Sequence, residues 1–153
     1  MAKIIHPIAG AVALLLIFTF WSTTIGVELF GTTRQVIAVK QAIPWGFLLL
    51  IPAMAVTGGT GAIRSRGRTG GLVGRKTRRM QYAAANGILV LIPAALFLSR
   101  QAAAGDFGWA FQTVQAVELI AGTVNLALIG LNMRDGLRMS GRLRRRSRGK
   151  SVG

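Results

Sequence analysis

The residues best suited to chemistry lie along one face of the last long apolar segment, residues 109–133. Polar or small side chains recur there three, four, three and seven positions apart, at Gln115, Glu118, Gly122, Asn125 and Asn132. This spacing places them on one side of a helix. Because an ionisable side chain inside a membrane helix usually marks a function, the sequence predicts an intramembrane polar site centred on Glu118.

Glu118 lies nine residues into this segment, which is roughly mid-membrane at ~1.5 Å per residue. An ionised carboxylate at that depth is costly, so we expect Glu118 to be protonated or paired. Since no lysine or arginine is expected within the apolar cores, the predicted partners are amides and hydroxyls. These are Gln115 and Asn125 on the same segment, Asn86 on the preceding one, and Thr19 or Ser22 on the first.

Two roles for Glu118 stand side by side. As a proton relay or ligand-binding group, it would change its protonation state or its partner during function. As a neutral carboxylic acid, it would only donate a hydrogen bond between helices. The residue pattern does not choose between these roles.

His6, the one histidine of the chain, is a candidate haem ligand. A b-type haem in a helix bundle commonly has two axial ligands, so the second would come from His6 of a homodimer partner or from a methionine. Met54, Met80 and Met133 are predicted to lie near the same side. The favoured interpretation is simpler, namely that His6 anchors the first turn at the membrane interface. The absence of cysteine excludes disulfides and thiolate metal sites.

The composition is that of a membrane protein. Charged residues make up 15% of the chain, whereas a soluble domain carries about 25%. Four mostly apolar runs, residues 5–30, 39–56, 80–98 and 109–133, are each long enough to cross a ~30 Å hydrocarbon core. Short connections between them predict an all-α, up-down four-helix bundle over residues 1–137, integral to a membrane. Residues 138–153 form a basic tail that we expect to be disordered.

The distribution of cations predicts the orientation. Lys3, seven cations of the second loop and eight from Arg134 onward fall on one side of a four-span chain. Arg34, Lys40 and Arg100 fall on the other. The positive-inside rule therefore predicts that both termini are cytoplasmic. The net charge of +15 is attributed to this asymmetry and to anionic lipid, and nucleic acid is not an expected partner.

The second loop and the tail supply the cations that we expect to contact anionic lipid headgroups. These are Arg75, Lys76, Arg78, Arg79, Arg142, Arg144, Arg145, Arg146 and Arg148.

Two acids close to helix C-terminal ends, Glu28 and Asp135, oppose the helix dipole and should each need a cation. The expected partners are Arg34 or Lys40 for Glu28, and Arg138 or a second-loop arginine for Asp135. Arg134 is adjacent to Asp135 in sequence and is not expected to face it.

Several short motifs carry a resemblance to known proteins. They are residues 6–10 (HPIAG), 41–46 (QAIPWG), 57–61 (TGGTG) and 132–137 (NMRDGL). These stretches are similar to those of small, uncharacterised four-span proteins of the bacterial inner membrane. The resemblance implies that fold and that location, and no activity. The general shape also resembles small b-type cytochromes, from which this chain departs by lacking a second histidine.

Three function classes compete. The favoured one is a non-catalytic inner-membrane protein, an accessory or scaffold subunit whose basic cytoplasmic face contacts anionic lipid, alone or within a homodimer or larger membrane complex. It is favoured because no complete catalytic constellation is present. The alternatives are a membrane redox carrier that binds haem b or quinone, and a small transporter or proton pathway through Glu118.

Overall fold

The computed structural model describes residues 2–65 and 70–139. These residues form α1 (Ala2–Phe30), α2 (Thr33–Ser65), α3 (Gly71–Asn86), a π-helical turn η1 (Gly87–Leu91), α4 (Ile92–Ala104) and α5 (Trp109–Met139). No strand occurs within the described ranges. The predicted lipid contacts of the tail, Arg142, Arg144, Arg145, Arg146 and Arg148, lie outside the described residues.

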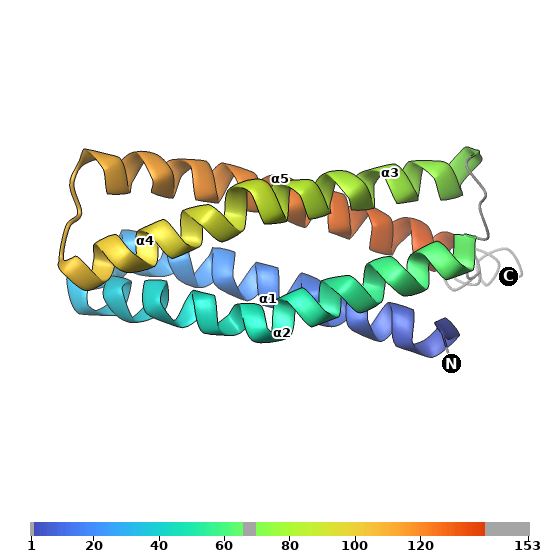
Figure 1. The fold of residues 1–153 in the computed structure, drawn as a ribbon, viewed down its shortest axis with the longest axis horizontal. Helices are drawn as coiled ribbons and strands as arrows, with labels where there is room; N and C mark the ends of the chain where they lie inside the picture. The colour runs from blue at the N-terminus through green and yellow to red at the C-terminus, as the bar shows by residue number, and fades with distance from the viewer. Residues whose placement is uncertain (1, 66–69, 140–153) are drawn as a thin grey trace, which may run out of the picture.

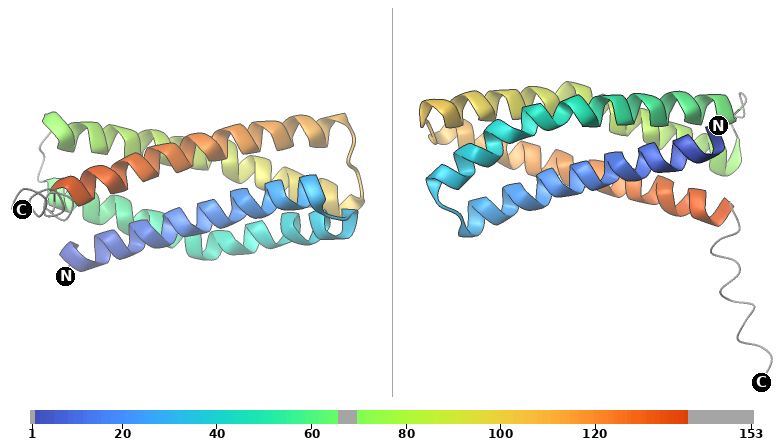
Figure 2. Two further views of the ribbon diagram at one scale, coloured as in Figure 1. Left: turned by 180° about the vertical axis from the view of Figure 1, so that it is seen from behind. Right: turned by 90° about the horizontal axis from the view of Figure 1, so that it is seen from below.

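The elements form four long rods, because α3, η1 and α4 continue one another (Figure 1). Successive rods run in opposite directions along the long axis, and the views in Figure 2 agree. The start of α1 and the end of α5 lie at the same end of the molecule. Within the described residues, four stretches are long and apolar enough to cross a membrane: Ile4–Phe30, Thr33–Ile63, Val73–Ala104 and Trp109–Arg138. The fold is thus all-helical, as predicted.

The turn between α1 and α2 is much shorter than the predicted loop of residues 31–40. A reciprocal capping box ends it: the Thr32 backbone N–H donates to Gln35 Oε1 at 2.7 Å, and the Gln35 N–H lies 3.4 Å from Thr32 Oγ1. Such a pair satisfies two backbone donors at a helix start and fixes where the helix begins. The helix therefore starts at Thr33, six residues before the predicted apolar run, and Lys40 lies inside it.

The third rod changes its winding just before Pro93. Proline has no N–H and its ring collides with the carbonyl four residues earlier in a regular helix. The structure inserts the π turn Gly87–Leu91 there, and the Ile92 N–H bonds to the Gly87 carbonyl, five residues back. One wider turn thus accommodates the proline, and the rod continues as α4.

Two small apolar clusters hold the rods together. One contains Val36, Leu98, Ala102 and Phe111, and the other contains Ile17, Ala83 and Ile129. Many large apolar side chains point outward instead, among them Leu15, Leu48, Leu89 and Ile120. A water-soluble protein rarely exposes so much contiguous apolar surface, whereas a lipid environment requires it.

Candidate functional site

The interior of the bundle contains an ion pair between α2 and α5. Lys40 Nζ donates to Glu118 Oε2 at 2.6 Å. The Lys40 side chain is fully buried and that of Glu118 is 12% exposed. Both groups are therefore enclosed by protein rather than turned to the surroundings.

The prediction that amides or hydroxyls pair with Glu118 was wrong. It assumed that the apolar cores contain no cation, but the early start of α2 carries Lys40 seven residues into the helix, ~10 Å from its end. Glu118 lies nine residues, ~14 Å, from the start of α5 at the same end of the bundle. The two charges thus reach similar depths. Because α5 extends to Met139, Glu118 also lies in the first third of its helix rather than at the middle.

Burial makes this pair strongly interdependent. Removing two charges from water is costly, and their attraction offsets that cost only while both are present. If one partner is lost, the other becomes an unpaired charge at the depth of the hydrocarbon core. The pair links α2 to α5 across the interior of the bundle, because these two helices do not pack directly against each other.

A second polar tie joins the third rod to α5. Asn86 Nδ2 donates to the Ala121 carbonyl at 2.8 Å and to Asn125 Oδ1 at 2.9 Å. Asn125 is buried. Two of the three predicted site amides, Asn86 and Asn125, therefore bond to each other rather than to Glu118.

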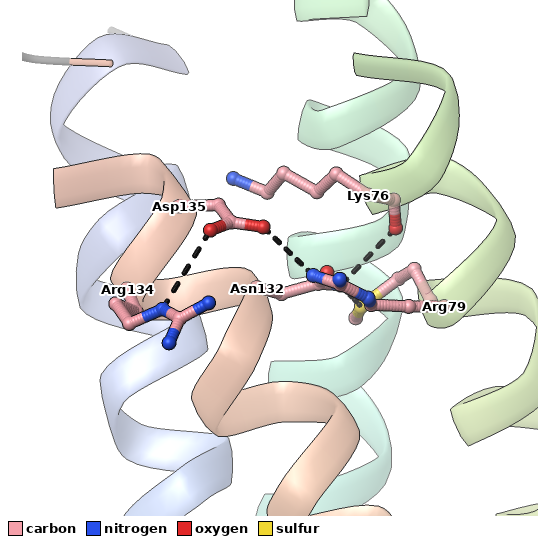
Figure 3. Close-up of polar contacts among 6 residues, drawn as sticks. Lys76, Arg79, Asn132, Arg134 and Asp135 are labelled. Carbon is pink, nitrogen blue, oxygen red and sulfur yellow. Dashed lines mark hydrogen bonds and ion pairs between the residues drawn. The ribbon is translucent and has the colours of Figure 1, made fainter. Parts of the chain in front are cut away.

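A third polar layer lies at the end of the bundle that holds the start of α1. Arg79 Nη1 donates to Asp135 Oδ2 at 2.7 Å, and Asn132 Nδ2 donates to the Lys76 carbonyl at 3.1 Å (Figure 3). The predicted pairing of Asp135 with a second-loop arginine is confirmed. Arg134 also contacts Asp135, with Nε 3.8 Å from Oδ1, so the expectation that it faces away was wrong.

Two other side chains, Gln115 and Glu28, have buried polar atoms without hydrogen-bond partners among the described residues. Gln115 is 4% exposed, yet neither its Nε2 nor its Oε1 has a hydrogen-bond partner among the described residues. Oε1 of Glu28 is likewise buried without a partner there, and Lys40, one of its two predicted partners, bonds to Glu118 instead. A buried polar group without a partner costs about 1–3 kcal/mol.

A small cavity adjoins the ion pair. Its volume is about 60 Å³, and its walls include Trp21, Thr24, Phe47, Glu118 and Gly122. Most of its other walls are apolar, so Glu118 and Thr24 are the polar side chains that could bind water there. Trp21 is fixed beside it, since its Nε1–H donates to the Leu119 carbonyl at 3.3 Å and to Thr123 Oγ1 at 3.1 Å.

His6 fastens the start of α1 to the end of α2. Its Nδ1 lies 3.1 Å from the Thr57 carbonyl and 3.0 Å from Thr60 Oγ1. A carbonyl only accepts, so Nδ1 carries the proton. This arrangement favours the anchoring role.

A haem ligated by His6 would use Nε2, and it would still need a second ligand. Of the predicted methionines, Met80 accepts a weak hydrogen bond from Asn132 at 3.8 Å and Met54 packs against the core. These two side chains are therefore engaged with other residues.

The four predicted lipid contacts of the second loop stand on a helix rather than on a flexible loop, because α3 begins at Gly71. Arg75 and Arg78 are exposed, whereas Lys76 and Arg79 are half-buried. Figure 3 shows the Lys76 side chain reaching across toward α5, above Asp135. Among the described residues, no three histidine, cysteine, aspartate or glutamate side chains gather into a metal-binding group.

Comparisons of the chain with protein-family models, with curated proteins and with solved structures found no match. Its function must therefore be inferred from the geometry of its own residues.

Proposed function

We propose that the chain is a non-catalytic integral protein of the bacterial inner membrane, an accessory or scaffold subunit with a basic cytoplasmic face on anionic lipid. The observation that carries this proposal is the use of the interior polar groups. Lys40 pairs with Glu118, and Asn86 pairs with Asn125, each bond joining two different helices. Side chains that hold helices in register are not available to bind and turn over a substrate without opening the bundle.

The orientation in this proposal has both termini in the cytoplasm. It is supported by the uneven ends of the bundle. The described residues place Arg75, Lys76, Arg78, Arg79, Arg134 and Arg138 at the end that holds the start of α1. Arg34 and Arg100 lie toward the other end, where Lys40 is neutralised by Glu118. Cytoplasmic ends of membrane proteins carry such an excess of cations.

Cysteine labelling tests the orientation directly, because the chain has no cysteine of its own. Ala103→Cys at the end of α4 should react with a membrane-impermeant maleimide in intact cells that lack an outer-membrane barrier. Ser151→Cys should react only after the inner membrane is opened. Labelling of Ser151→Cys in intact cells would reverse the orientation.

Reconstitution tests the absence of catalysis and transport. We expect liposomes that contain the purified protein to show the same proton leak as empty liposomes at every pH, and the protein to show no haem absorbance band. A proton flux that is abolished by Glu118→Gln in folded protein would contradict the proposal and establish a pathway.

That pathway is the second candidate function, and the cavity beside Glu118 is the observation that favours it. A proton would reach the carboxylate by this route only if water entered the cavity and Lys40 released Glu118. The ion pair must open for each transfer, so this candidate requires a conformational change that the scaffold proposal does not.

A further inference from the structure

A groove runs along the outer surface between the third rod and α5. Tyr82, Ala85 and Leu89 form one wall, and Val124 and Leu128 form the other. The groove is shallow and largely open to its surroundings, with a volume of about 480 Å³. A lipid chain could therefore lie along this surface between the two helices, in contact with the surrounding bilayer.

The lining of the groove is apolar where a chain would lie. Tyr82 and Leu89 are 62% and 73% exposed. Asn86 also borders the groove, but its amide is already bonded to Ala121 and Asn125. A hydrocarbon chain would thus cover apolar atoms without stranding a polar group.

Arginines stand on the same helical face above this groove. Arg75 and Arg78 precede Tyr82 by seven and four positions, spacings that align side chains along one side of a helix. Both are exposed. Across the groove, Asp135 follows Leu128 by seven positions and continues the line of the other wall. The Arg79–Asp135 pair therefore lies at the end of the groove nearest the start of α3, which we call the head of the groove. Arg78 is next to Arg79 in sequence, and Arg75 lies one turn closer to the start of α3.

The charge at the head of the groove is far from balanced. Lys76, Arg79 and Arg134 surround the single carboxylate of Asp135 (Figure 3). Arg75, Arg78 and Arg138 add three more cations on the same ends of α3 and α5. Guanidinium groups pair well with phosphate oxygens, often through two hydrogen bonds. A phosphate is the counter-charge that this arrangement lacks.

We propose that this groove seats one anionic phospholipid, with an acyl chain along Tyr82, Ala85 and Leu89 and its phosphate at Arg75 and Arg78. The proposal rests on the proposed function, since it needs the basic end at a lipid headgroup layer. Tyr82 suits the boundary between the two parts, because tyrosine favours the interface between headgroups and hydrocarbon. A second copy of the chain is a poorer occupant, since it would bring two sets of cations together.

Native mass spectrometry of the full chain in detergent, titrated with phosphatidylglycerol or phosphatidylcholine, tests the proposal. We expect one phosphatidylglycerol to bind with higher affinity than any further copies, and more tightly than phosphatidylcholine. The double variant Arg75→Gln/Arg78→Gln should lower the affinity of that first site on the order of thirtyfold. The matched control Arg34→Gln/Arg100→Gln removes two cations from the opposite end and should leave it unchanged.

A second variant tests the acyl part of the site. Ala85→Phe fills the groove and should weaken the first phosphatidylglycerol about tenfold or more. Its control, Ala42→Phe, adds the same ring to an exposed position of α2 and should have no effect. Helical circular dichroism and size exclusion in detergent confirm that each variant is folded.

Three outcomes would overturn the site. Unchanged binding in Ala85→Phe with loss in the arginine variant would mean a diffuse electrostatic surface, and the proposed function would survive. Displacement of the lipid by inorganic phosphate alone would mean a free-anion site. Equal phosphatidylglycerol binding in all variants would mean no site at this end. Failure of the proposed function is detected separately, by the flux and labelling experiments.

Discussion

Two ion pairs connect α5 to other helices in opposite halves of the bundle, and they differ in their surroundings. Lys40–Glu118 is enclosed among apolar and aromatic side chains. Arg79–Asp135 lies among other cations, with a second arginine already at 3.8 Å from the carboxylate. Among the described residues, Lys40 is the one cation that contacts Glu118, whereas Arg134 contacts Asp135 in addition to Arg79. The two ion pairs have similar N–O distances, but Glu118 depends on its one cation far more than Asp135 depends on Arg79.

The largest effect should come from breaking the enclosed pair. Lys40→Met leaves the Glu118 carboxylate buried without its cation, and we expect a loss of about 3–5 kcal/mol in unfolding free energy. Reversible unfolding in mixed detergent micelles, followed by circular dichroism, measures it. The double variant Lys40→Met/Glu118→Leu should recover most of that loss, because no charge remains buried. Additive losses in the double variant would show that the two residues act independently.

Breaking the basic-end pair should have a smaller effect. In Arg79→Gln, Arg134 can take over part of the interaction with Asp135, so we expect the thermal midpoint to fall by less than half as much as in Lys40→Met. Raising the salt concentration should narrow the difference between Arg79→Gln and the parent protein, since Arg79 and Arg134 are partly exposed and salt screens charges that reach the surface. The same salt series should leave the effect of Lys40→Met unchanged. Equal salt dependence of both variants would contradict the contrast drawn between the two ends.

The hydrogen bond between Asn86 and Asn125 should contribute less to stability than the Lys40–Glu118 ion pair. A double-mutant cycle on Asn86→Leu and Asn125→Leu should give a coupling energy of about 0.6–1.7 kcal/mol, the range for hydrogen bonds between membrane helices. Unfolding in the same micelles provides the measurement. A coupling energy near zero would mean that the Asn86 bond to the Ala121 carbonyl carries the tie alone.

The smallest effect, with the opposite sign, is expected at Gln115. Its amide is buried without a partner among the described residues, so Gln115→Leu removes an unsatisfied group and should be neutral or stabilising by up to ~1 kcal/mol. The matched change Asn125→Leu, about three turns further along the same face, should destabilise. If Gln115→Leu destabilises the protein as much as Asn125→Leu does, the Gln115 amide has a hydrogen-bond partner in the folded protein, such as a water molecule inside the bundle.

Much of the fold was predictable because lipid imposes a simple rule. Long apolar runs must become helices that satisfy their own backbone groups, so the four rods follow from hydropathy alone. The shared face of Gln115, Asn125 and Asn132 follows from helical spacing, and all three are buried. The arginine partner of Asp135 was also predictable, because an acid at a helix end next to a basic segment has few alternatives.

The partner of Glu118 was missed for a physical reason. Hydropathy shows which part of a helix is apolar but not where the helix begins, and α2 begins six residues before its apolar run. The signal was present in the Thr32–Gln35 capping box, whose threonine and glutamine are three positions apart. Even with that boundary, choosing Lys40 over an amide requires the relative depth of two helices that are distant in the chain, which no local pattern specifies.

The π turn before Pro93 was also missed, because a proline predicts a disturbance of the helix but not its form.

The separation of Lys40 and Glu118 along the chain, 78 residues, has a consequence for biosynthesis. At ~5–20 residues per second, a ribosome needs roughly 4 to 16 seconds to make the carboxylate after the lysine. During that interval the nascent α2 carries a lone ammonium into the lipid, or waits beside the insertion machinery. We expect chains truncated before α5 to insert α2 poorly, and the change Lys40→Met to relieve the delay in such chains while it weakens the finished protein.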